Sequence, residues 1–479
     1  MPARTHTLAR GIFKAMGLFG GQQVVAILCA VVRTKLVALW IGPAGVGLMG
    51  LYSSAVDMIN TVSNLGIRSS SVRDISMAKA SGRRELIARI VAIVRRWSWA
   101  LGVVWAFVML AFSPALSRVT FGDSSHVWDF MALSACVLIF AVTNCEQAIM
   151  QGTQKLKWLA KSSVLGMVTG LALSIPMYYF WRVDSIVPSI IVYSAAAGVF
   201  AWIFRNREYD RDPVSLTPRQ TVKGGAEFVK LGICITVSAF VVQFVSYAFM
   251  AYLNHRAGTA TVGLYRAGDT LVNRYGALLF SAIGLEFYPR LAAVCGSRAR
   301  LRVFVSQEAN VALYVLVPVL VLFMLLRGLI VDLLYTGEFR AMIPFMSWCM
   351  LGTVLKGVSW CMSYVILAKG ASKVYLVTEC ASAAICLALN ITFYELWGLV
   401  GLGVSYALWY LLYLAMVWAV YRRVFGLKLH PSVVPHTVYA LAAVGGAMWC
   451  CDNGLTAAAI VIAVATAAWS AIKIKKSVA

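Results

Sequence analysis

Long apolar runs separated by short polar connections dominate the chain. A helix needs about 20 apolar residues to cross the hydrocarbon core of a bilayer, and a scan with that window predicts about fourteen spans. The pattern therefore predicts an all-α polytopic membrane protein with about fourteen transmembrane helices. The predicted spans are centred in residues 12–40, 45–67, 91–112, 128–149, 162–181, 188–204, 226–253, 263–288, 306–330, 341–367, 374–394, 398–421, 435–450 and 455–472.

Lysine and arginine concentrate in every second connection. The opposite connections hold few cations, and acids such as Asp123 and Asp332 offset them. By the positive-inside rule, both termini are predicted to be cytoplasmic. The cation-rich connections contain Arg68, Arg73, Lys79, Arg83, Arg84 and Arg89; Lys155, Lys157 and Lys161; Arg205, Arg207, Arg211, Arg219 and Lys223; Arg290, Arg298, Arg300 and Arg302; Lys369 and Lys373; and Arg422, Arg423 and Lys428.

The connection at 205–225 mixes both charge signs with two prolines, "RNREYDRDPVSLTPRQTVKGG", and reads as a linker. It divides the chain into a predicted N-lobe at 1–204, a cytoplasmic linker at 205–225, a C-lobe at 226–425 and a C-terminal helix pair at 426–479.

A loose internal repeat supports two lobes. The segment from Val46, "VGLMGLYSSAVDMINTVSNLGIRSSSVRDISMAKASG", can be laid beside the segment from Val262, "VGLYRAGDTLVNRYGALLFSAIGLEFYPRLAAVCGSRA". Both are predicted to cross the membrane in the same direction, as in transporters built from parallel repeats. Two such lobes facing each other would enclose a central cavity, which favours a transporter.

Composition agrees with this class. Hydrophobic residues make up 61% of the 479 residues and charged residues 13%, and the mean hydropathy is +0.80. The net charge of +23 follows the predicted topology, so we expect membrane lipids and no nucleic acid as partners. The 11 cysteines contain no C-x-x-C pair and the 5 histidines are scattered, which predicts no metal site and no cofactor.

Polar side chains recur at helical spacing inside two of the predicted spans. In the second span, Asp57 and Asn60 belong to a polar face. In the eighth span, Arg266, Asp269, Asn273 and Arg274 crowd one side. Elsewhere, Lys35 lies toward the outer end of the first span, and Lys356 lies inside the apolar stretch "FMSWCMLGTVLKGVSWCMSYVILAKG".

Cations exceed acids within this buried polar set. Lys35, Arg266, Arg274 and Lys356 stand against Asp57 and Asp269. Unpaired positive charge facing a cavity is costly unless an anion or water enters, so the excess predicts an anionic cargo.

A purely structural explanation also stays open. Asp57 could pair with a cation of the first span, and Asp269 with Arg266 or Arg274. Three other cations, Arg33, Arg95 and Arg96, are expected to extend to lipid headgroups.

Several segments resemble the Wzx-type polysaccharide flippases of the multidrug/oligosaccharidyl-lipid/polysaccharide (MOP) exporter superfamily. The resemblance is carried by "KLVALWIGPAGVGLMGLYSS", "LGIRSSSVRDISMAKASG", "EFYPRLAAV" and "LYTGEFRAMIPFMSWCMLGTVLKGVSWCMSYVILAKGASKVYLVTE", and it extends over about residues 8–425. It implies two lobes of six helices that alternate between inward- and outward-facing states. The two C-terminal helices would lie beyond this twelve-helix core. The implied cargo is an undecaprenyl-pyrophosphate-linked oligosaccharide, moved from the cytoplasmic to the periplasmic leaflet of a bacterial inner membrane, with a polysaccharide polymerase as a further candidate partner.

Roles for individual residues follow from depth, helical face and this resemblance. Lys35, Arg266, Arg274 and Lys356 are predicted to receive the pyrophosphate. Asp57, Asp269, Asn60 and Asn273 are predicted to tune or gate those charges. Gly42-Pro43-Ala44-Gly45 is the predicted outer hinge, and Arg73 and Arg290 are predicted cytoplasmic headgroup contacts.

Three alternatives remain at this point. Two of them belong to the same superfamily: a lipid II flippase, and an ion-coupled exporter of another anionic amphiphile. A cation-coupled drug antiporter of that superfamily is disfavoured, because it would prefer an acidic cavity and the predicted cavity is basic. A polytopic polymerase or ligase would need a large outer loop with catalytic acids or arginines, and each predicted outer connection is short. We therefore expect a transporter with no catalytic residues.

Overall fold

The computed structural model describes residues 2–209, 217–274 and 294–478, together with residues 276, 280, 284, 287, 290 and 291. Side chains are described from residue 21 onward, except for short stretches that include 223–232 and Arg274. The chain forms two compact units, Met1–Val262 and Gly263–Ala479. The lobe boundaries expected from the sequence stay a prediction.

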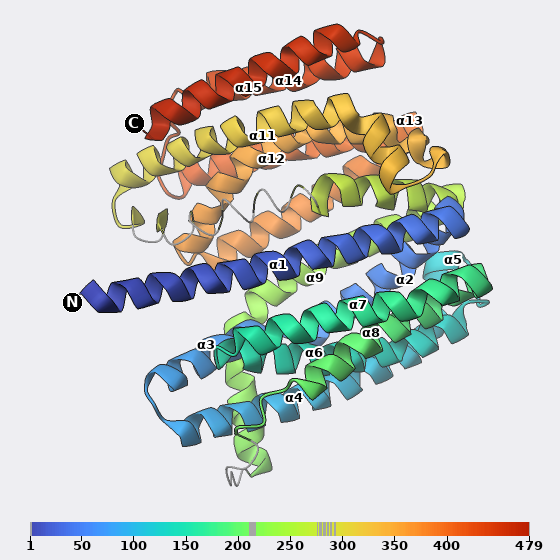
Figure 1. Cartoon of the computed structure of the whole chain (residues 1–479), viewed down its shortest axis with the longest axis vertical. Coiled ribbons are helices and arrows are strands. Elements are labelled where there is room, and N and C mark those ends of the chain that lie inside the picture. Colours follow the sequence, from blue (N-terminus) through green and yellow to red (C-terminus); the bar gives the residue numbers. More distant parts are fainter. Residues whose placement is uncertain are drawn as a thin grey trace. The chain divides into compact units, whose positions relative to one another are not determined.

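The first unit is built from helices that run largely side by side (Figure 1). The amphipathic or apolar pattern of each helix buries one face: α4 packs on α6, α6 on α8, and α7 on both α8 and α1. Phe130, Leu133 and Val137 of α6 are fully buried in this core. The helices are α1 (Pro2–Trp40), α2 (Gly42–Ser63), α3 (Ile67–Ala80), α4 (Arg84–Ala111), α5 (Ser113–Phe121), α6 (Val127–Gly152), α7 (Leu156–Trp181), the short η1 (Arg182–Ser185), α8 (Ile186–Ile203) and most of α9 (Pro218–Asp269).

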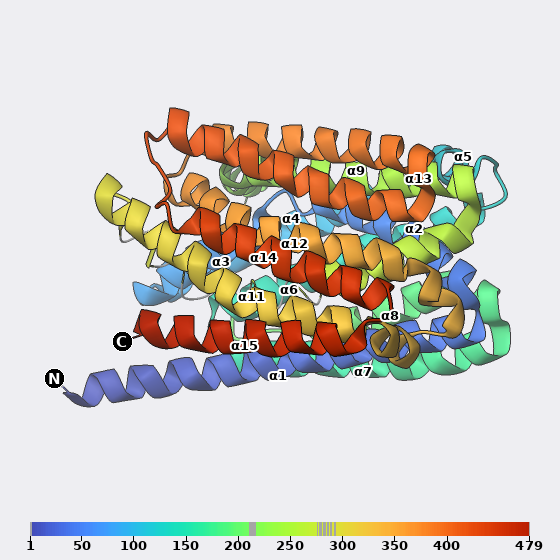
Figure 2. The same cartoon turned by 90° about the horizontal axis from the view of Figure 1, so that it is seen from above.

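The second unit packs around α12. This helix lies against α11, α13 and α14, and α11 also packs on α14 and α15 (Figure 2). Within it, Cys361 and Met362 are fully buried. The elements are the π-helical η2 (Thr270–Arg274), α11 (Arg298–Leu334), η3 (Gly337–Met342), α12 (Ile343–Ala368), α13 (Ser372–Arg423), α14 (Val433–Asp452) and α15 (Thr456–Val478).

Two long helices are interrupted where the chain reverses. The α13 helix breaks at Trp397 and Gly398, and Gly398 has φ 58°. The α9 helix breaks at Gly258, whose φ is 78°. Glycine adopts these left-handed angles without steric penalty, so each glycine separates two predicted spans at the expected place.

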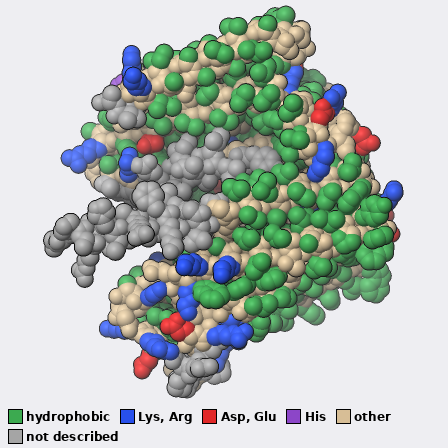
Figure 3. Space-filling model, viewed as in Figure 1, with side chains coloured by type: hydrophobic (Ala, Val, Ile, Leu, Met, Phe, Trp, Pro, Cys, Tyr) green, Lys and Arg blue, Asp and Glu red, His purple; other side chains and the backbone are tan. Residues whose placement is uncertain are grey.

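Each of the predicted spans overlaps a helix of the described chain, including the weak ones at 435–450 and 455–472, which form α14 and α15. Among the described residues, 10 helical segments are long and apolar enough to cross a membrane, and three of these overlap two predicted spans each: Leu156–Ile203, Thr236–Asn273 and Ser372–Arg423. Hydrophobic side chains cover the flanks of the helices, and lysines and arginines gather near helix ends (Figure 3). The protein is thus a multi-pass membrane protein, and its described part is all helical apart from connections, as predicted.

Candidate functional site

Lys356 of α12 is held by polar side chains of two neighbouring elements. Its ammonium donates to Oδ1 of Asn273 at 2.7 Å and lies 3.5 Å from the hydroxyl of Tyr406. The apolar sequence of α12 buries most of this helix, and Lys356 is half-buried between the buried Leu355 and Gly357. The lysine therefore stays at depth rather than extending to a helix end.

The amide of Asn273 is oriented by three hydrogen bonds. Its Oδ1 also accepts from the Tyr406 hydroxyl at 2.8 Å, and its Nδ2 donates to Oδ1 of Asp269 at 2.6 Å. Asn273 lies in η2, and the wider turn of a π-helix is frequent at functional sites. A guanidinium nitrogen of Arg266 lies 3.7 Å from Oδ2 of Asp269. We call Arg266, Asp269, Asn273, Lys356 and Tyr406 the Lys356 cluster.

Aromatic rings enclose the lysine. Its ammonium lies 5.7 Å from the ring centroid of Phe280 and 5.3 Å from that of Tyr410. Tyr406 and Tyr410 are in contact, with their ring centroids 4.8 Å apart. Ring faces attract a cation but leave its charge uncancelled.

The Lys356 cluster carries a positive surplus. It contains two cations and a single carboxylate, and that carboxylate faces Arg266. In the described part of the chain, no acid lies within ion-pair distance of Lys356. An ammonium has three donors, so after Asn273 and Tyr406 Lys356 retains donor capacity for the oxygens of an anion.

The structure thus brings together four of the predicted site residues: Arg266, Asp269, Asn273 and Lys356. The side chain of Arg274, predicted to join them, lies outside the described residues. Tyr406 was not predicted as a site residue. Its spacing of four from Tyr410 on one apolar helix was the available signal, because it places both rings on one face.

The remaining predicted residues lie elsewhere. In the first unit, Lys35 and Asp57 are half-buried on α1 and α2, and Asn60 accepts from Ser63 through Oδ1 at 3.4 Å. Arg73 is 53% exposed and pairs with Asp74 at 2.8 Å. In the second unit, Arg290 is exposed. Their roles stay predictions.

The predicted outer hinge lies where α1 ends and α2 begins. Gly42 has φ 80°, and Pro43 starts the first turn of α2. A Cβ on Gly45 would lie 2.4 Å from Cγ2 of Ile41, so only a glycine fits this close turn. The backbone is therefore tightly specified here, and hinge motion itself stays a prediction.

The expectation that Arg95 extends to lipid headgroups is wrong. Its guanidinium forms a bidentate pair with Glu146 of α6, at 2.7 Å and 2.9 Å, and the Glu146 side chain is 2% exposed. Arg33 also turns inward, donating to the hydroxyl of buried Tyr178 at 3.0 Å. In both cases the guanidinium bonds to a buried polar side chain of another helix, and the contact of Arg95 is a bidentate charge-assisted pair.

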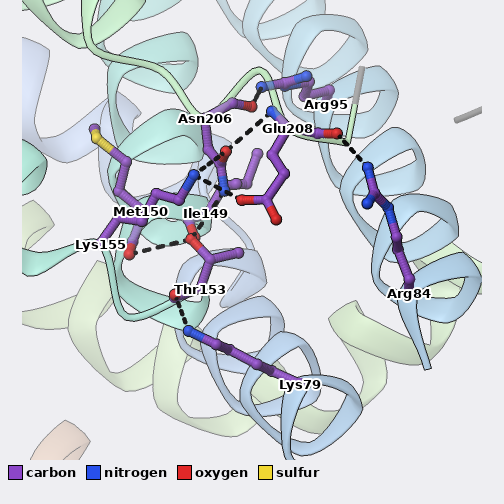
Figure 4. Close-up of polar contacts among 9 residues, drawn as sticks. All are labelled: Lys79, Arg84, Arg95, Ile149, Met150, Thr153, Lys155, Asn206 and Glu208. Carbon is purple, nitrogen blue, oxygen red and sulfur yellow. Dashed lines mark hydrogen bonds and ion pairs between the residues drawn. The ribbon is translucent and has the colours of Figure 1, made fainter. Parts of the chain in front are cut away.

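The Arg95–Glu146 pair adjoins a polar network, and Figure 4 shows its members Arg95, Lys155, Asn206 and Glu208. Arg95 also donates to the backbone carbonyl of Asn206 at 3.2 Å. Lys155 donates to Oδ1 of Asn206 at 2.8 Å and pairs with Glu208 at 2.8 Å. We call these residues the Glu146 network, and it ties the segment after α8 onto α4, α6 and the start of α7.

A family model described as "Polysaccharide biosynthesis protein" matches residues 36–344. Two curated relatives match over most of their length. The "Lipid III flippase" of Escherichia coli (strain K12) is 18% identical over 84% of this chain and 97% of that protein. A "Putative O-antigen transporter" of Shigella flexneri is 21% identical over 82% of this chain and 92% of that protein.

A solved structure of the lipid II flippase MurJ, in an inward closed conformation, superposes with a TM-score of 0.70. The two chains are 11% identical, and the match covers 97% of this chain and 99% of that one. At this identity the likeness concerns the fold, which is also that of solved MOP transporters. The resemblance noted in the sequence is thereby confirmed: the chain belongs to the polysaccharide biosynthesis protein family and has the fold of the MOP superfamily.

Proposed function

We propose that this protein is a flippase for an undecaprenyl-pyrophosphate-linked oligosaccharide. It moves this lipid from the cytoplasmic to the periplasmic leaflet by alternating access, and it serves the synthesis of a surface polysaccharide. Curated relatives named as a lipid III flippase and a putative O-antigen transporter support the cargo class. The family description supports the polysaccharide pathway.

The observation that carries the proposal is the environment of Lys356. A lysine buried in an apolar helix is retained only when something offsets its desolvation. Its described partners are an amide, a phenol and two aromatic rings, all uncharged. A pyrophosphate supplies the missing negative charge together with acceptor oxygens for the free ammonium donors.

The aromatic side chains fit the sugar part of the same cargo. Tyr406, Trp409 and Tyr410 form a run of touching rings, with Trp409 and Tyr410 centroids 4.5 Å apart. Tyr rings present both an apolar face and a hydroxyl, as sugar surfaces require. We infer that the pyrophosphate sits at Lys356 and that the first sugars lie over these rings.

A deletion strain tests the proposal. Polyprenyl-linked sugars would be extracted and identified by mass spectrometry, after labelling of intact cells with a periodate-hydrazide reagent that does not cross the membrane. We expect the lipid-linked oligosaccharide to accumulate unlabelled and the surface glycan to disappear, and a plasmid copy should restore both. Labelled lipid together with a normal glycan would contradict the proposal.

The same strain separates the alternative cargoes. Export of the peptidoglycan precursor is essential, so a lipid II flippase without a redundant partner would give no viable deletion. If a viable deletion instead accumulates lipid-linked glycan outside the membrane, labelled single repeat units indicate a polymerase defect and labelled polymer-length chains a ligase defect. Accumulation of a short, unlabelled repeat unit is the result that the flippase proposal requires.

A further inference from the structure

An apolar groove in the second unit lies apart from the Lys356 cluster. Its volume is 610 Å³, within the range of about 300–1,000 Å³ that is typical of small-molecule sites. The walls come from α12 and from two segments of helices that pack on α12, the second half of α13 and the start of α14 (Figure 2). Leu355, Leu411 and Val434 are among the lining residues, and Val434 is 63% exposed, so the groove opens sideways along the helices.

Three nitrogen-bearing side chains stand at one end of this groove. Arg422 lies in the last turn of α13, and Lys428 and His430 lie in the connection to α14. All three are exposed, and the Arg422 guanidinium lies 5.5 Å from the ring of Trp418, another lining residue. The groove is therefore apolar along its walls and cationic at its mouth.

The imidazole of His430 presents a donor to the mouth. Its Nδ1 accepts from the backbone N–H of Ser432 at 3.3 Å and lies 2.9 Å from the Ser432 hydroxyl. In the neutral ring an accepting Nδ1 places the proton on Nε2. A phosphate at the mouth would thus meet a guanidinium, an ammonium and an imidazole N–H.

We propose that this groove is a binding site for an anionic membrane phospholipid, with the phosphate between Arg422, Lys428 and His430 and one acyl chain along the apolar walls. The charge pattern requires an anionic head joined to an apolar tail. The sideways opening suits a ligand that enters from the bilayer. By the predicted orientation this mouth lies at the cytoplasmic leaflet, where anionic lipid attracts basic segments. The proposal rests on neither the identity of the cargo nor the transport step.

Lipid binding to the full-length protein, purified in mild detergent and stripped of lipid, tests the site. Each of two lipids, dioleoyl phosphatidylglycerol and dioleoyl phosphatidylethanolamine, would be titrated into the protein, and the bound fraction would be measured by native mass spectrometry. We expect phosphatidylglycerol to bind more tightly, and the double variant Arg422→Gln/Lys428→Gln to weaken it about 25-fold, because each cation near the headgroup contributes about fivefold. Arg423→Gln is the matched control, since Arg423 is exposed beside Arg422 and does not line the groove.

A second variant tests the tail without changing charge. Ala415→Trp fills the groove and is expected to weaken both phospholipids while leaving the preference for phosphatidylglycerol. Equal binding of the two lipids, or unchanged binding by the double variant, overturns the proposal. So does displacement of phosphatidylglycerol by equimolar undecaprenyl phosphate, which would assign the groove to the cargo tail, or by millimolar inorganic phosphate, which would reduce it to an ion site.

Discussion

Two buried cations in this protein have opposite surroundings. Arg95 of the first unit meets the carboxylate of Glu146 through two hydrogen bonds of 2.7 Å and 2.9 Å. Lys356 of the second unit meets the amide of Asn273 at 2.7 Å, together with aromatic rings. The first pair neutralises its own charge, and the second leaves a charge to be neutralised by something else.

The difference separates a structural cation from a binding one. A bidentate arginine–carboxylate pair is geometrically complete, and it holds α4 on α6 whether or not cargo is present. A lysine with neutral partners keeps its charge at a continuing cost in desolvation. Under the proposed function, the anionic cargo would offset this cost at Lys356. Breaking the Arg95–Glu146 pair should therefore reduce stability and spare transport, whereas removing the charge of Lys356 should reduce transport and spare stability.

The largest effect is expected for stability, from Glu146→Ala. This change leaves the half-buried Arg95 guanidinium without its carboxylate, and losing one partner of a buried pair costs about 3–5 kcal/mol. We expect a lower melting temperature in detergent and less protein in the membrane. Transport per folded molecule should stay near the wild-type value.

Two further variants sharpen that result. Glu85→Ala removes an exposed acid of α4 and should leave the melting temperature unchanged. The double variant Arg95→Met/Glu146→Leu removes both charges and should recover most of the stability, because apolar replacements of a buried pair are often neutral or stabilising. A double variant as unstable as Glu146→Ala would show that the ion pair stabilises the fold beyond neutralising its own two charges.

Lys356→Met is expected to abolish most transport while sparing the fold. Losing one partner of a buried, hydrogen-bonded charge pair costs about 2–5 kcal/mol in binding, which is at least about 30-fold in the rate at low cargo concentration. The melting temperature should stay the same or rise, because an uncompensated buried charge is gone. Surface glycan and lipid-linked oligosaccharide would be measured in the deletion strain at matched protein levels.

The control for this variant is Lys373→Met, which removes an exposed lysine near the start of α13. It should transport normally. Normal transport by Lys356→Met as well would remove the main support for an anion at this lysine.

Thr353→Asp would give Lys356 an acidic partner, as Glu146 is for Arg95. Thr353 lies one turn before Lys356 on α12 and is buried, so an aspartate there would become an internal counter-ion. We expect transport to fall about tenfold, because the cargo anion must now displace a resident charge. Thr353→Asn has the same shape without the charge and should transport well; equal loss in both variants would indicate a packing effect instead.

The sequence could predict the helices and the surplus of positive charge, but not the distinction between the two regions. Apolar runs located most of the spans, because lipid demands a continuous helix of known length; the predicted second span forms the helix α2, which is not among the 10 described segments apolar enough to cross a membrane. Helical spacing placed Asp269 and Asn273 on one face. It could not show that Glu146, 51 residues away, lies against Arg95, so Arg95 was predicted to reach lipid. Nor could it show that Tyr406 reaches Asn273 across a separation of 133 residues. Such partners are set by how helices pack.

Tyr406→Phe tests the neutral shell around Lys356. The phenol donates to Asn273 at 2.8 Å, and a buried hydrogen bond contributes about 1 kcal/mol, or about fivefold in an equilibrium constant. We expect an increase of about this size in the cargo concentration needed for half-maximal transport, with the maximal rate unchanged. Tyr439→Phe, on α14 and away from the cluster, should have no effect. A change in maximal rate alone would instead place Tyr406 in the conformational step.

The smallest effect is expected at the exposed end of the Glu146 network, and it depends on pH. A hydrogen bond from Lys155 lowers the pKa of Glu208 below its ordinary value of 4.5. A depressed pKa means that the ionised form of Glu208 is favoured in the folded protein. Its contribution to stability is therefore present above about pH 4.5 and is lost as the pH falls through the folded pKa.

The Glu208 side chain is 45% exposed, so screening by solvent keeps this contribution to stability within about 1 kcal/mol. The melting temperature of Glu208→Gln should lie slightly below that of wild type at pH 7, and the two should converge below pH 4.

The buried Glu146 should contribute more to stability than the exposed Glu208. Its pair with Arg95 is shielded from water, so Glu146→Ala should be much less stable than wild type at pH 7. A Glu208→Gln penalty as large as that of Glu146→Ala would mean that the exposed ion pair, rather than the buried one, holds the segment after α8 in place.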